Sequence, residues 1–307
     1  MSAGLHLALV GPTASGKSEL AMAVARRWPD VELVSVDSMQ VYRGMDVGTA
    51  KPSPAERAEV AVHLVDLAEP CEEFSVARFQ AAAADALAAI EARGHRALLV
   101  GGTGLYVRAV VDDLDVPGRW PEVRERLEHE PDTAALHRRL AALDPVAAGR
   151  MAPSNRRRVV RALEVTVGSG RPFSSFGPGL ERHPPSRFAL AGVWLPRPVL
   201  AERIARRLAA MVDGGLVEEA AALRRRPEGL SRTAQQALGY REVLRHLAGE
   251  CSLDEAVDEA VRRTRAFARR QRVWFRRDPR ITWYGAPANP LAVLPALLGD
   301  WGERCRS

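Results

Sequence analysis

One eight-residue stretch near the start of the chain constrains its fold more than any other. Residues 11–18 read GPTASGKS, which satisfies the pattern G-x-x-x-x-G-K-[ST] of a loop that binds the phosphates of ATP and other nucleotides. The apolar run Leu5–Val10 precedes it and an Ala-rich run follows it to Arg27, so it connects an expected strand to an expected helix. Loop N–H groups and the helix dipole then point at one spot. The sequence therefore predicts a site for a phosphate-bearing ligand.

Two residues of this loop add chemistry of their own. Lys17 supplies a full positive charge, and the Ser18 hydroxyl can hold a phosphate-bound Mg²⁺ ion. Lys17 and Lys51 are the only lysines among 44 Lys and Arg residues. A chain that otherwise uses arginine keeps lysine where a compact ammonium is wanted. Lys51 is therefore either a second lysine with a specific role or an ordinary surface residue.

The composition narrows the class of protein. With 307 residues, 47% hydrophobic and 27% charged, the chain fits a soluble enzyme of one large domain, or a core with a smaller domain attached. The net charge of +6 suggests an anionic partner, which could be phosphates, tRNA or an acidic membrane. Three scattered cysteines argue against disulfides or zinc and favour the cytoplasm. No apolar run approaches the roughly 18 residues that span a bilayer, so we expect no membrane.

Further strand-like runs predict the fold class. Apolar runs lie at residues 31–37, 63–67, 97–100, 188–195 and 281–284. Helix-like stretches separate them, which predicts an α/β fold, a P-loop NTPase-like parallel sheet flanked by helices. Ligands of such sheets bind beyond the carboxyl ends of the strands, where Asp37 and the Gly-rich turn 101–104 are expected. Asp37 is then a metal ligand, a general base or a turn cap.

The middle of the chain differs from its two ends. After Asp115, residues 117–185 are helical, charged and finally rich in Gly, Pro and Ser, with no strand-like run. We therefore predict a P-loop core at 1–116, a helical insertion domain at 117–185 and a return to the core at 186–307. Ser75 is expected to cap a helix that ends at Gly94. Other expected helices lie at residues 198–211, 216–225, 233–247 and 253–277.

Two basic clusters separate the possible functions. In the insertion, Arg157, Arg158 and Arg161 share one helical face. In the helix 253–277, five arginines form a stripe about 20 Å long, namely Arg262, Arg265, Arg269, Arg272 and Arg276. The opposite face is expected to use Val257, Val261, Thr264, Phe267 and Trp274. Each cluster alone could be a solvated surface, but both together with a phosphate loop indicate a polyanionic substrate.

Taken in order, the motifs resemble the bacterial tRNA dimethylallyltransferases (isopentenyl-tRNA transferases). The resemblance runs from about residue 5 to residue 284. Besides residues 11–18, it rests on SVDSMQVY at 35–42, GTAKP at 48–52, VGGTGLY at 100–106, RVVRALE at 158–164, QALGYRE at 236–242, and Thr264-Arg265, RRQ at 269–271 and WFR at 274–276.

The resemblance implies an activity and a set of roles. A dimethylallyl group would pass from dimethylallyl diphosphate to N6 of the adenosine immediately 3′ of the anticodon, with Mg²⁺ held in part by Ser18. Catalysis would depend on Asp37, Lys17 and Thr13, with Asp37 accepting a hydrogen bond or proton from the adenine amine. The insertion 117–185 would contact the anticodon stem-loop. We expect a monomer.

The resemblance also implies binding residues. The diphosphate contacts would be Gly11, Pro12, Thr13, Ala14, Ser15, Gly16, Lys17, Ser18, Arg161 and Arg241. The tRNA contacts would be Asp37, Ser38, Met39, Gln40, Thr103, Arg124, Arg157, Arg158, Val159, Val160, Arg161, Arg265 and Arg269. The family commonly has Asp-Pro-Gln-Arg where this chain has residues 155–158 as NRRR. Arg157 keeps donors but has no acceptor, so it suits a phosphate better than a base.

Two other functions use part of the same pattern. A P-loop kinase of a small molecule, such as a nucleoside or shikimate, would explain the phosphate loop but not the arginine clusters. A non-enzymatic RNA-binding protein switched by a nucleoside triphosphate would explain both but would not need Asp37.

Overall fold

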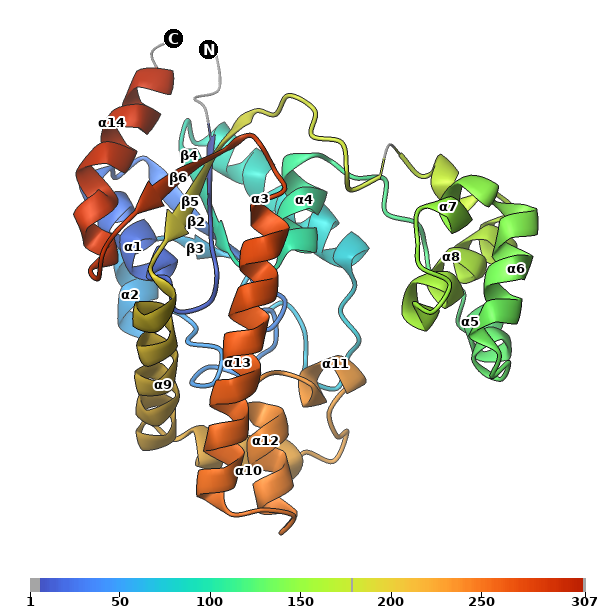
Figure 1. The fold of residues 1–307 in the computed structure, drawn as a ribbon. Coiled ribbons are helices and arrows are strands. Elements are labelled where there is room, and N and C mark those ends of the chain that lie inside the picture. The colour runs from blue at the N-terminus through green and yellow to red at the C-terminus, as the bar shows by residue number, and fades with distance from the viewer. Residues whose placement is uncertain (1–5, 178, 306–307) are drawn as a thin grey trace. The chain divides into compact units, whose positions relative to one another are not determined.

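The computed structural model describes residues 6–177 and 179–305, and its centre is a six-stranded sheet (Figure 1). The strand order is β3-β2-β4-β1-β5-β6, and each neighbouring pair is parallel. This confirms the predicted α/β fold; Leu5, which began the first expected strand, lies outside the described residues. The strands are β1 His6–Val10, β2 Val31–Val36, β3 Val62–His63, β4 Arg96–Gly101, β5 Phe188–Trp194 and β6 Ile281–Gly285.

Helices cover both faces of the sheet because alternate strand residues point to opposite sides. Leu7 and Leu9 of β1 enter one hydrophobic cluster with α1 (Lys17–Arg27), η2 (Pro290–Val293) and α14 (Leu294–Arg304). Ala8 and Val10 enter the other cluster, with helices of the opposite face. Those helices are α3 (Val76–Ala92), α4 (Gly104–Val111), α9 (Arg197–Asp213), α10 (Leu216–Arg224), α12 (Tyr240–Leu247) and α13 (Leu253–Phe275).

Helix boundaries follow the local capping chemistry. Ser75 accepts a hydrogen bond from the N–H of Arg78 at the start of α3, and Gly94 follows the helix with φ 73°, as predicted. The first turn of α13 carries a capping box between Ser252 and Glu255. Helices α9 and α13 cover the same face of the sheet and lie side by side (Figure 1). The short helix α2 (Pro54–Glu59) precedes β3.

Four expectations about elements were wrong or incomplete. The strand expected at 63–67 ends at His63, because Leu64 and Asp66 have φ of 64° and 57°, outside the β region. The helix expected at 233–247 splits into α11 (Arg232–Gln235) and α12 at Gly239, whose φ is 89°. Helix α14 was not expected. The buried face of α13 consists of Ala256, Ala260, Thr264, Ala268, Gln271 and Phe275, of which only Thr264 was anticipated. The expected Val261 and Trp274 are half-buried and pack against the same core.

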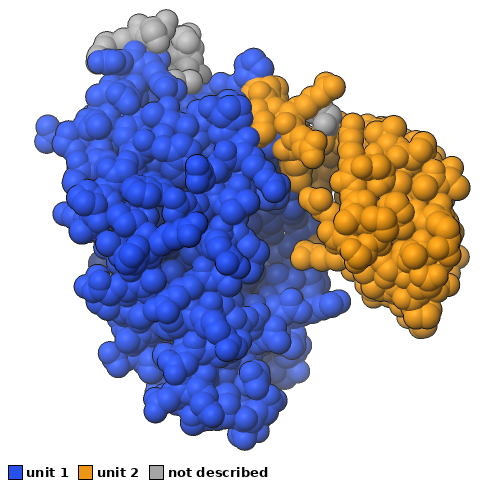
Figure 2. All heavy atoms as spheres, viewed as in Figure 1, with its two compact units in different colours: residues 1–111, 185–307 blue, residues 112–184 orange. Residues whose placement is uncertain are grey.

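The chain divides into two compact units (Figure 2). Unit 1 comprises Met1–Val111 and Pro185–Ser307, and unit 2 comprises Asp112–Pro184. The insertion predicted from the sequence had the bounds 117–185. Unit 2 contains α5 (Pro121–Glu128), α6 (Thr133–Leu143), α7 (Pro145–Gly149), α8 (Arg156–Ser169) and η1 (Phe173–Ser175). It has a hydrophobic core of its own around Leu140 and Leu163. Among the described residues, none of the helices combines the length and the apolar character needed to cross a bilayer.

Candidate active site

The phosphate loop joins β1 to α1 through a conformation that only a small residue allows. Gly16 has φ 86°, and a Cβ there would lie 2.1 Å from Cγ of Pro290. Ala14, at φ 61°, also adopts a left-handed conformation. Helix α1 begins at Lys17. The N–H groups of its first turn therefore have no partner within the helix and are available to an anion.

A cavity of about 610 Å³ opens beside this loop. The phosphate loop, residues 47–50 and α9 form its walls. One part of the lining is cationic, because Lys17, Arg203, Arg206 and Arg207 contribute to it. The remaining lining residues are Ala14, Gly16, Ser18, Glu19, Val47, Ala50, Ala210 and Met211. A cavity with a cationic part and an apolar part suits a ligand with an anionic group on a hydrocarbon.

Two cations of this cavity, Lys17 and Arg207, interact electrostatically with each other and with Asp37. The pKa of Lys17 is lowered to about 8, mainly by burial and also by the positive charge of Arg207, while Asp37 opposes the change. Burial also lowers the pKa of Arg207, again opposed by Asp37. The Nε of Arg203 donates to the carbonyl of Ala14 at 2.9 Å and so supports the loop. A bound diphosphate would relieve the mutual repulsion of Lys17 and Arg207.

Asp37 lies where the sequence predicted it, just beyond the carboxyl end of β2. Its Oδ1 accepts a hydrogen bond from the N–H of Met39 at 2.8 Å, so it also serves as a turn cap. The neighbouring Ser38 N–H donates to Thr103 Oγ1 at 3.3 Å. This link joins the segment after β2 to the Gly-rich turn after β4, its neighbour in the sheet. Asp37, Ser38 and Thr103 are therefore gathered at one edge.

Gln271 is a site-supporting residue that sequence reasoning missed. It is buried on α13, its Oε1 accepts the N–H of Thr13 at 2.8 Å, and its Nε2 donates to the carbonyl of Gly102 at 2.8 Å. One side chain therefore joins the phosphate loop to the second Gly-rich turn. In the sequence, Gln271 belongs to the RRQ segment at 269–271 that contributes to the resemblance, but no role was assigned to it.

Arg203 and Arg207 were missed as well. They lie four residues apart on α9, so they share one helix face. That spacing could have singled them out, but the chain contains so many arginines that it does not distinguish them. Their importance comes from α9 packing beside the phosphate loop.

Three residues that were predicted to contact tRNA have buried side chains. Gln40 is buried, accepts a hydrogen bond from Ser35 Oγ at 2.7 Å and donates to the carbonyls of Thr49 and Ala50, both at 3.2 Å. Its amide is therefore used within the protein. Val159 and Val160 are 0% and 2% exposed in the core of unit 2, where apolar packing holds them. The tRNA contacts predicted for these three residues stay predictions.

Unit 2 presents the other predicted arginines in two ways. Arg157 and Arg158 are exposed at the start of α8. Arg124 and Arg161 instead contact the buried carboxylate of Glu164, at 3.4 and 2.9 Å. Glu164 was not anticipated, and it orients both arginines. The predicted diphosphate contact of Arg161 stays a prediction.

The remaining predicted residues lie on the surface of unit 1. Arg241 on α12 is exposed and falls outside the set of described residues that line the cavity. Arg265 and Arg269 are exposed on α13, and Arg265 Nη2 donates to the carbonyl of Ala201 at 3.4 Å. Met39 is half-buried after β2. The roles assigned to these residues stay predictions.

The protein offers few metal ligands at this site. Within the part of the chain that the structure describes, no group of three or more His, Cys, Asp or Glu side chains could hold a metal ion. Ser18 is exposed at the start of α1 and lines the cavity. A magnesium ion can be coordinated by hydroxyl, phosphate and water oxygens together. The single hydroxyl of Ser18 therefore fits an ion that arrives with a diphosphate.

Comparison with known proteins gives a consistent result. The family described as IPP transferase matches residues 40–278, and the one described as isopentenyl transferase matches residues 4–66. A tRNA dimethylallyltransferase of Streptomyces avermitilis is 50% identical over 294 residues, covering 95% of this chain and 93% of that protein.

Comparison with solved structures points to the same family. The full-length tRNA isopentenylpyrophosphate transferase of Bacillus halodurans is 37% identical, with a TM-score of 0.69 over 98% of this chain and 97% of that one. The tRNA delta(2)-isopentenylpyrophosphate transferase of Staphylococcus epidermidis is 30% identical, with a TM-score of 0.70 over 97% and 98%. With family matches across most of its length and relatives near 50% identity, the chain belongs to the tRNA dimethylallyltransferase (IPP transferase) family.

Proposed function

We propose that the protein transfers a dimethylallyl group from dimethylallyl diphosphate to N6 of the adenosine immediately 3′ of the anticodon in tRNA. One observation carries this proposal beyond the family relationship. The cations Lys17 and Arg207 both interact electrostatically with Asp37 at one edge of the sheet. An anionic leaving group and a nucleophile that loses a proton need this combination.

On the donor side, the phosphate loop holds the diphosphate. The allylic C–O bond breaks, and its electron pair leaves with the diphosphate. Lys17, Arg207 and the N–H groups at the start of α1 stabilise the charge that develops there. The apolar lining near Val47 and Met211 accommodates hydrocarbon. Ser18 would help to hold a Mg²⁺ ion that arrives with the diphosphate, and this ion would supply additional positive charge.

On the acceptor side, Asp37 holds the N6 amine. A new C–N bond forms at the allylic carbon, and Asp37 accepts the proton that N6 loses. The adenine amine is a weak nucleophile, so alignment with the allylic carbon is a large part of the catalysis. Gln271 engages the N–H of Thr13 and thereby holds this part of the loop in place. The base leaves its stack at a cost of a few kcal/mol, which is lower in a loop than in a duplex.

The tRNA is held mainly by phosphate contacts. Arg157 and Arg158 of unit 2 and Arg269 of α13 are exposed and suited to this role. The net charge of +6 favours the same partner. Cys71 and Cys251 carry free thiols, which suits a protein that meets tRNA in the reducing cytoplasm.

The decisive experiment incubates the purified protein with labelled dimethylallyl diphosphate, Mg²⁺ and an anticodon stem-loop. We expect label on the RNA with the wild type and a loss of more than about a hundredfold in Asp37→Ala, with stem-loop binding retained. The matched control is Asp30→Ala, at the opposite end of β2, where Asp30 pairs with Arg96 instead. This control should transfer label normally.

The two alternative functions give different results in the same assay. A small-molecule kinase would release phosphate from ATP and transfer no label. A nucleotide-switched RNA-binding protein would bind the stem-loop and be indifferent to Asp37. Either result would reject the proposed reaction.

A further inference from the structure

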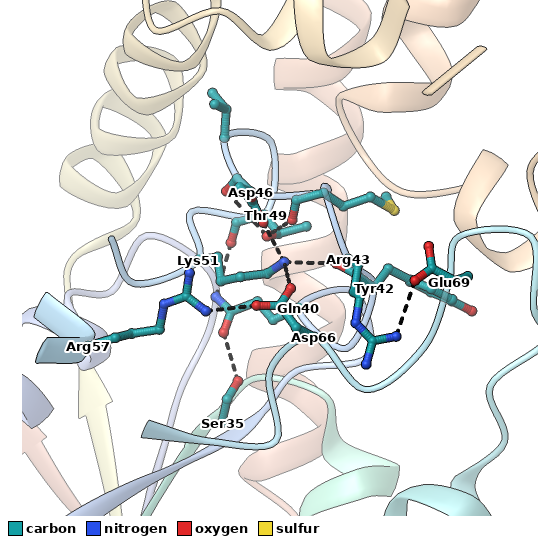
Figure 3. A network of polar contacts seen from close by, with 12 residues as sticks. Ser35, Gln40, Tyr42, Arg43, Asp46, Thr49, Lys51, Arg57, Asp66 and Glu69 are labelled. Atoms are coloured by element: carbon teal, nitrogen blue, oxygen red, sulfur yellow. Dashed lines mark hydrogen bonds and ion pairs between the residues drawn. The ribbon is translucent and has the colours of Figure 1, made fainter. Parts of the chain in front are cut away.

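Lys51 is buried at the centre of a network of hydrogen bonds and ion pairs (Figure 3). Its side chain is 1% exposed, and Nζ donates to the carbonyl of Tyr42 at 2.8 Å, to Asp46 Oδ1 at 2.5 Å and to Asp66 Oδ1 at 2.6 Å. All three ammonium protons are therefore engaged. Lys51 is neither a surface lysine nor in reach of a ligand, so its role is exerted through the residues that it holds.

The segment that Lys51 holds is residues 45–51, which we call the 45–51 loop. Lys51 closes it by binding Asp46 near its start. Gln40 Nε2 donates to the carbonyls of Thr49 and Ala50. From the other side, the carboxylate of Glu219 accepts the N–H groups of Asp46 and Val47, both at 2.9 Å. The loop is thus tied to the segment after β2, to the segment after β3 and to α10.

This loop forms a wall of the cavity beside the phosphate loop. Val47 and Ala50 line that cavity. The carbonyl of Thr49 lies 3.5 Å from Nη2 of Arg207, which donates to it. The loop therefore contributes both apolar surface and a hydrogen-bond acceptor that directs a guanidinium in the cavity.

We propose that Lys51 is a positioning residue for the diphosphate of the donor, acting through the 45–51 loop on Arg207. This inference rests on the proposed function. A lysine suits the position because a compact ammonium can donate to three oxygens in a space closed to solvent, whereas a planar guanidinium directs its donors differently. Losing the ammonium leaves Asp46 and Asp66 without their central partner, so the carbonyl of Thr49 and with it Arg207 lose their fixed position.

The test measures the Kd of inorganic pyrophosphate and of dimethylallyl diphosphate by calorimetry. In Lys51→Met we expect both Kd values to rise about tenfold, the size of one lost charge-assisted hydrogen bond. Asp46→Asn, whose carboxylate is half exposed, should fold readily and raise both values in the same direction. The Kd of the anticodon stem-loop should stay unchanged in both variants.

The matched control is Arg57→Met. Arg57 also binds Asp66, at 2.7 Å, but lies outside the 45–51 loop, so its loss should lower the melting temperature without moving the pyrophosphate Kd. Should Lys51→Met fail to fold, Asp46→Asn alone decides. A lowered melting temperature with unchanged pyrophosphate binding would reduce Lys51 to a purely structural residue and overturn the inference.

A double-mutant cycle tests whether the effect passes through Arg207. We expect Lys51→Met to change the pyrophosphate Kd little when Arg207→Met is already present, because the position of the missing guanidinium no longer matters. Fully additive effects would contradict this route. If the wild type transfers no label but Lys51→Met still weakens pyrophosphate binding, the proposed reaction fails and the positioning role survives.

Discussion

At the scale of single residues, the charge of Lys17 depends on its surroundings. Burial and the nearby Arg207 destabilise the ammonium, while Asp37 stabilises it. Arg203, also beside the loop, engages the carbonyl of Ala14. The site therefore holds cations whose charge favours the binding of an anion. This arrangement makes ligand binding sensitive to pH in a defined direction.

We expect the affinity for pyrophosphate to fall as the pH rises through about 8, the pKa of Lys17, because the ammonium becomes neutral. Stability should change in the opposite direction. The unfolded lysine titrates near 10.5, so the cost of burying the charge disappears as the pH rises from about 8 to 10.5. Calorimetry and thermal unfolding across this range measure the two effects. An unchanged pH dependence of binding in Lys17→Arg would rule out Lys17 as its source.

At the scale of elements, α13 holds two loops that are distant in sequence. Gln271 bonds the phosphate loop and the second Gly-rich turn. One turn further along, Trp274 packs so closely on Gly104 that a Cβ there would lie 2.1 Å from the indole nitrogen. The helix thus sets the distance between the ends of β1 and β4. This role was hidden because the exposed arginines dominate the sequence of α13.

Replacing Gln271 with Leu should destabilise the protein by about 2 kcal/mol, because the Thr13 N–H and the Gly102 carbonyl lose their partner. We also expect label transfer to fall at least about tenfold, since the phosphate loop shifts. Gln80→Leu is the matched control, because Gln80 donates to the carbonyl of Ala109 away from the site. Urea unfolding and the transfer assay compare the two. Equal losses of activity would mean that Gln271 has no specific role.

At the scale of the whole molecule, the chain leaves unit 1 and returns to it at one place. Ser186 Oγ donates to the carbonyl of Val111 at 2.8 Å, so the two ends of the insertion meet in unit 1. Unit 2 has its own hydrophobic core. Neither unit needs the other to bury its apolar residues, which predicts that they can be separated.

We therefore expect that replacing residues 112–184 with a short Gly/Ser linker leaves unit 1 folded. Pyrophosphate should bind with its normal Kd, because the residues that line the cavity all belong to unit 1. The anticodon stem-loop should bind more weakly and with a smaller salt dependence, because Arg157 and Arg158 are removed. Circular dichroism, calorimetry and stem-loop titrations at several salt concentrations measure these outcomes. Full stem-loop affinity would show that unit 2 is not the RNA-binding part.

Features that depend on neighbouring residues could be predicted from the sequence. Strand β1, the phosphate loop and α1 follow one another along the chain, so their pattern defines the anion site locally. The cap at Ser75 and the position of Asp37 after β2 are local for the same reason. Hydrophobic patterning also indicated the parallel sheet, because β1, β2 and most of β5 are buried on both faces.

Contacts between segments that are distant in the sequence were decided only by the tertiary structure. Arg207 reaches the phosphate loop because α9 packs beside it, and Gln271 joins two loops because α13 crosses between them. Lys51 could be noticed in the sequence as a rare lysine, but its partners Asp46 and Asp66 became known only once the chain was folded. Local patterns specify which groups a segment carries, whereas packing determines which of them meet and which are buried.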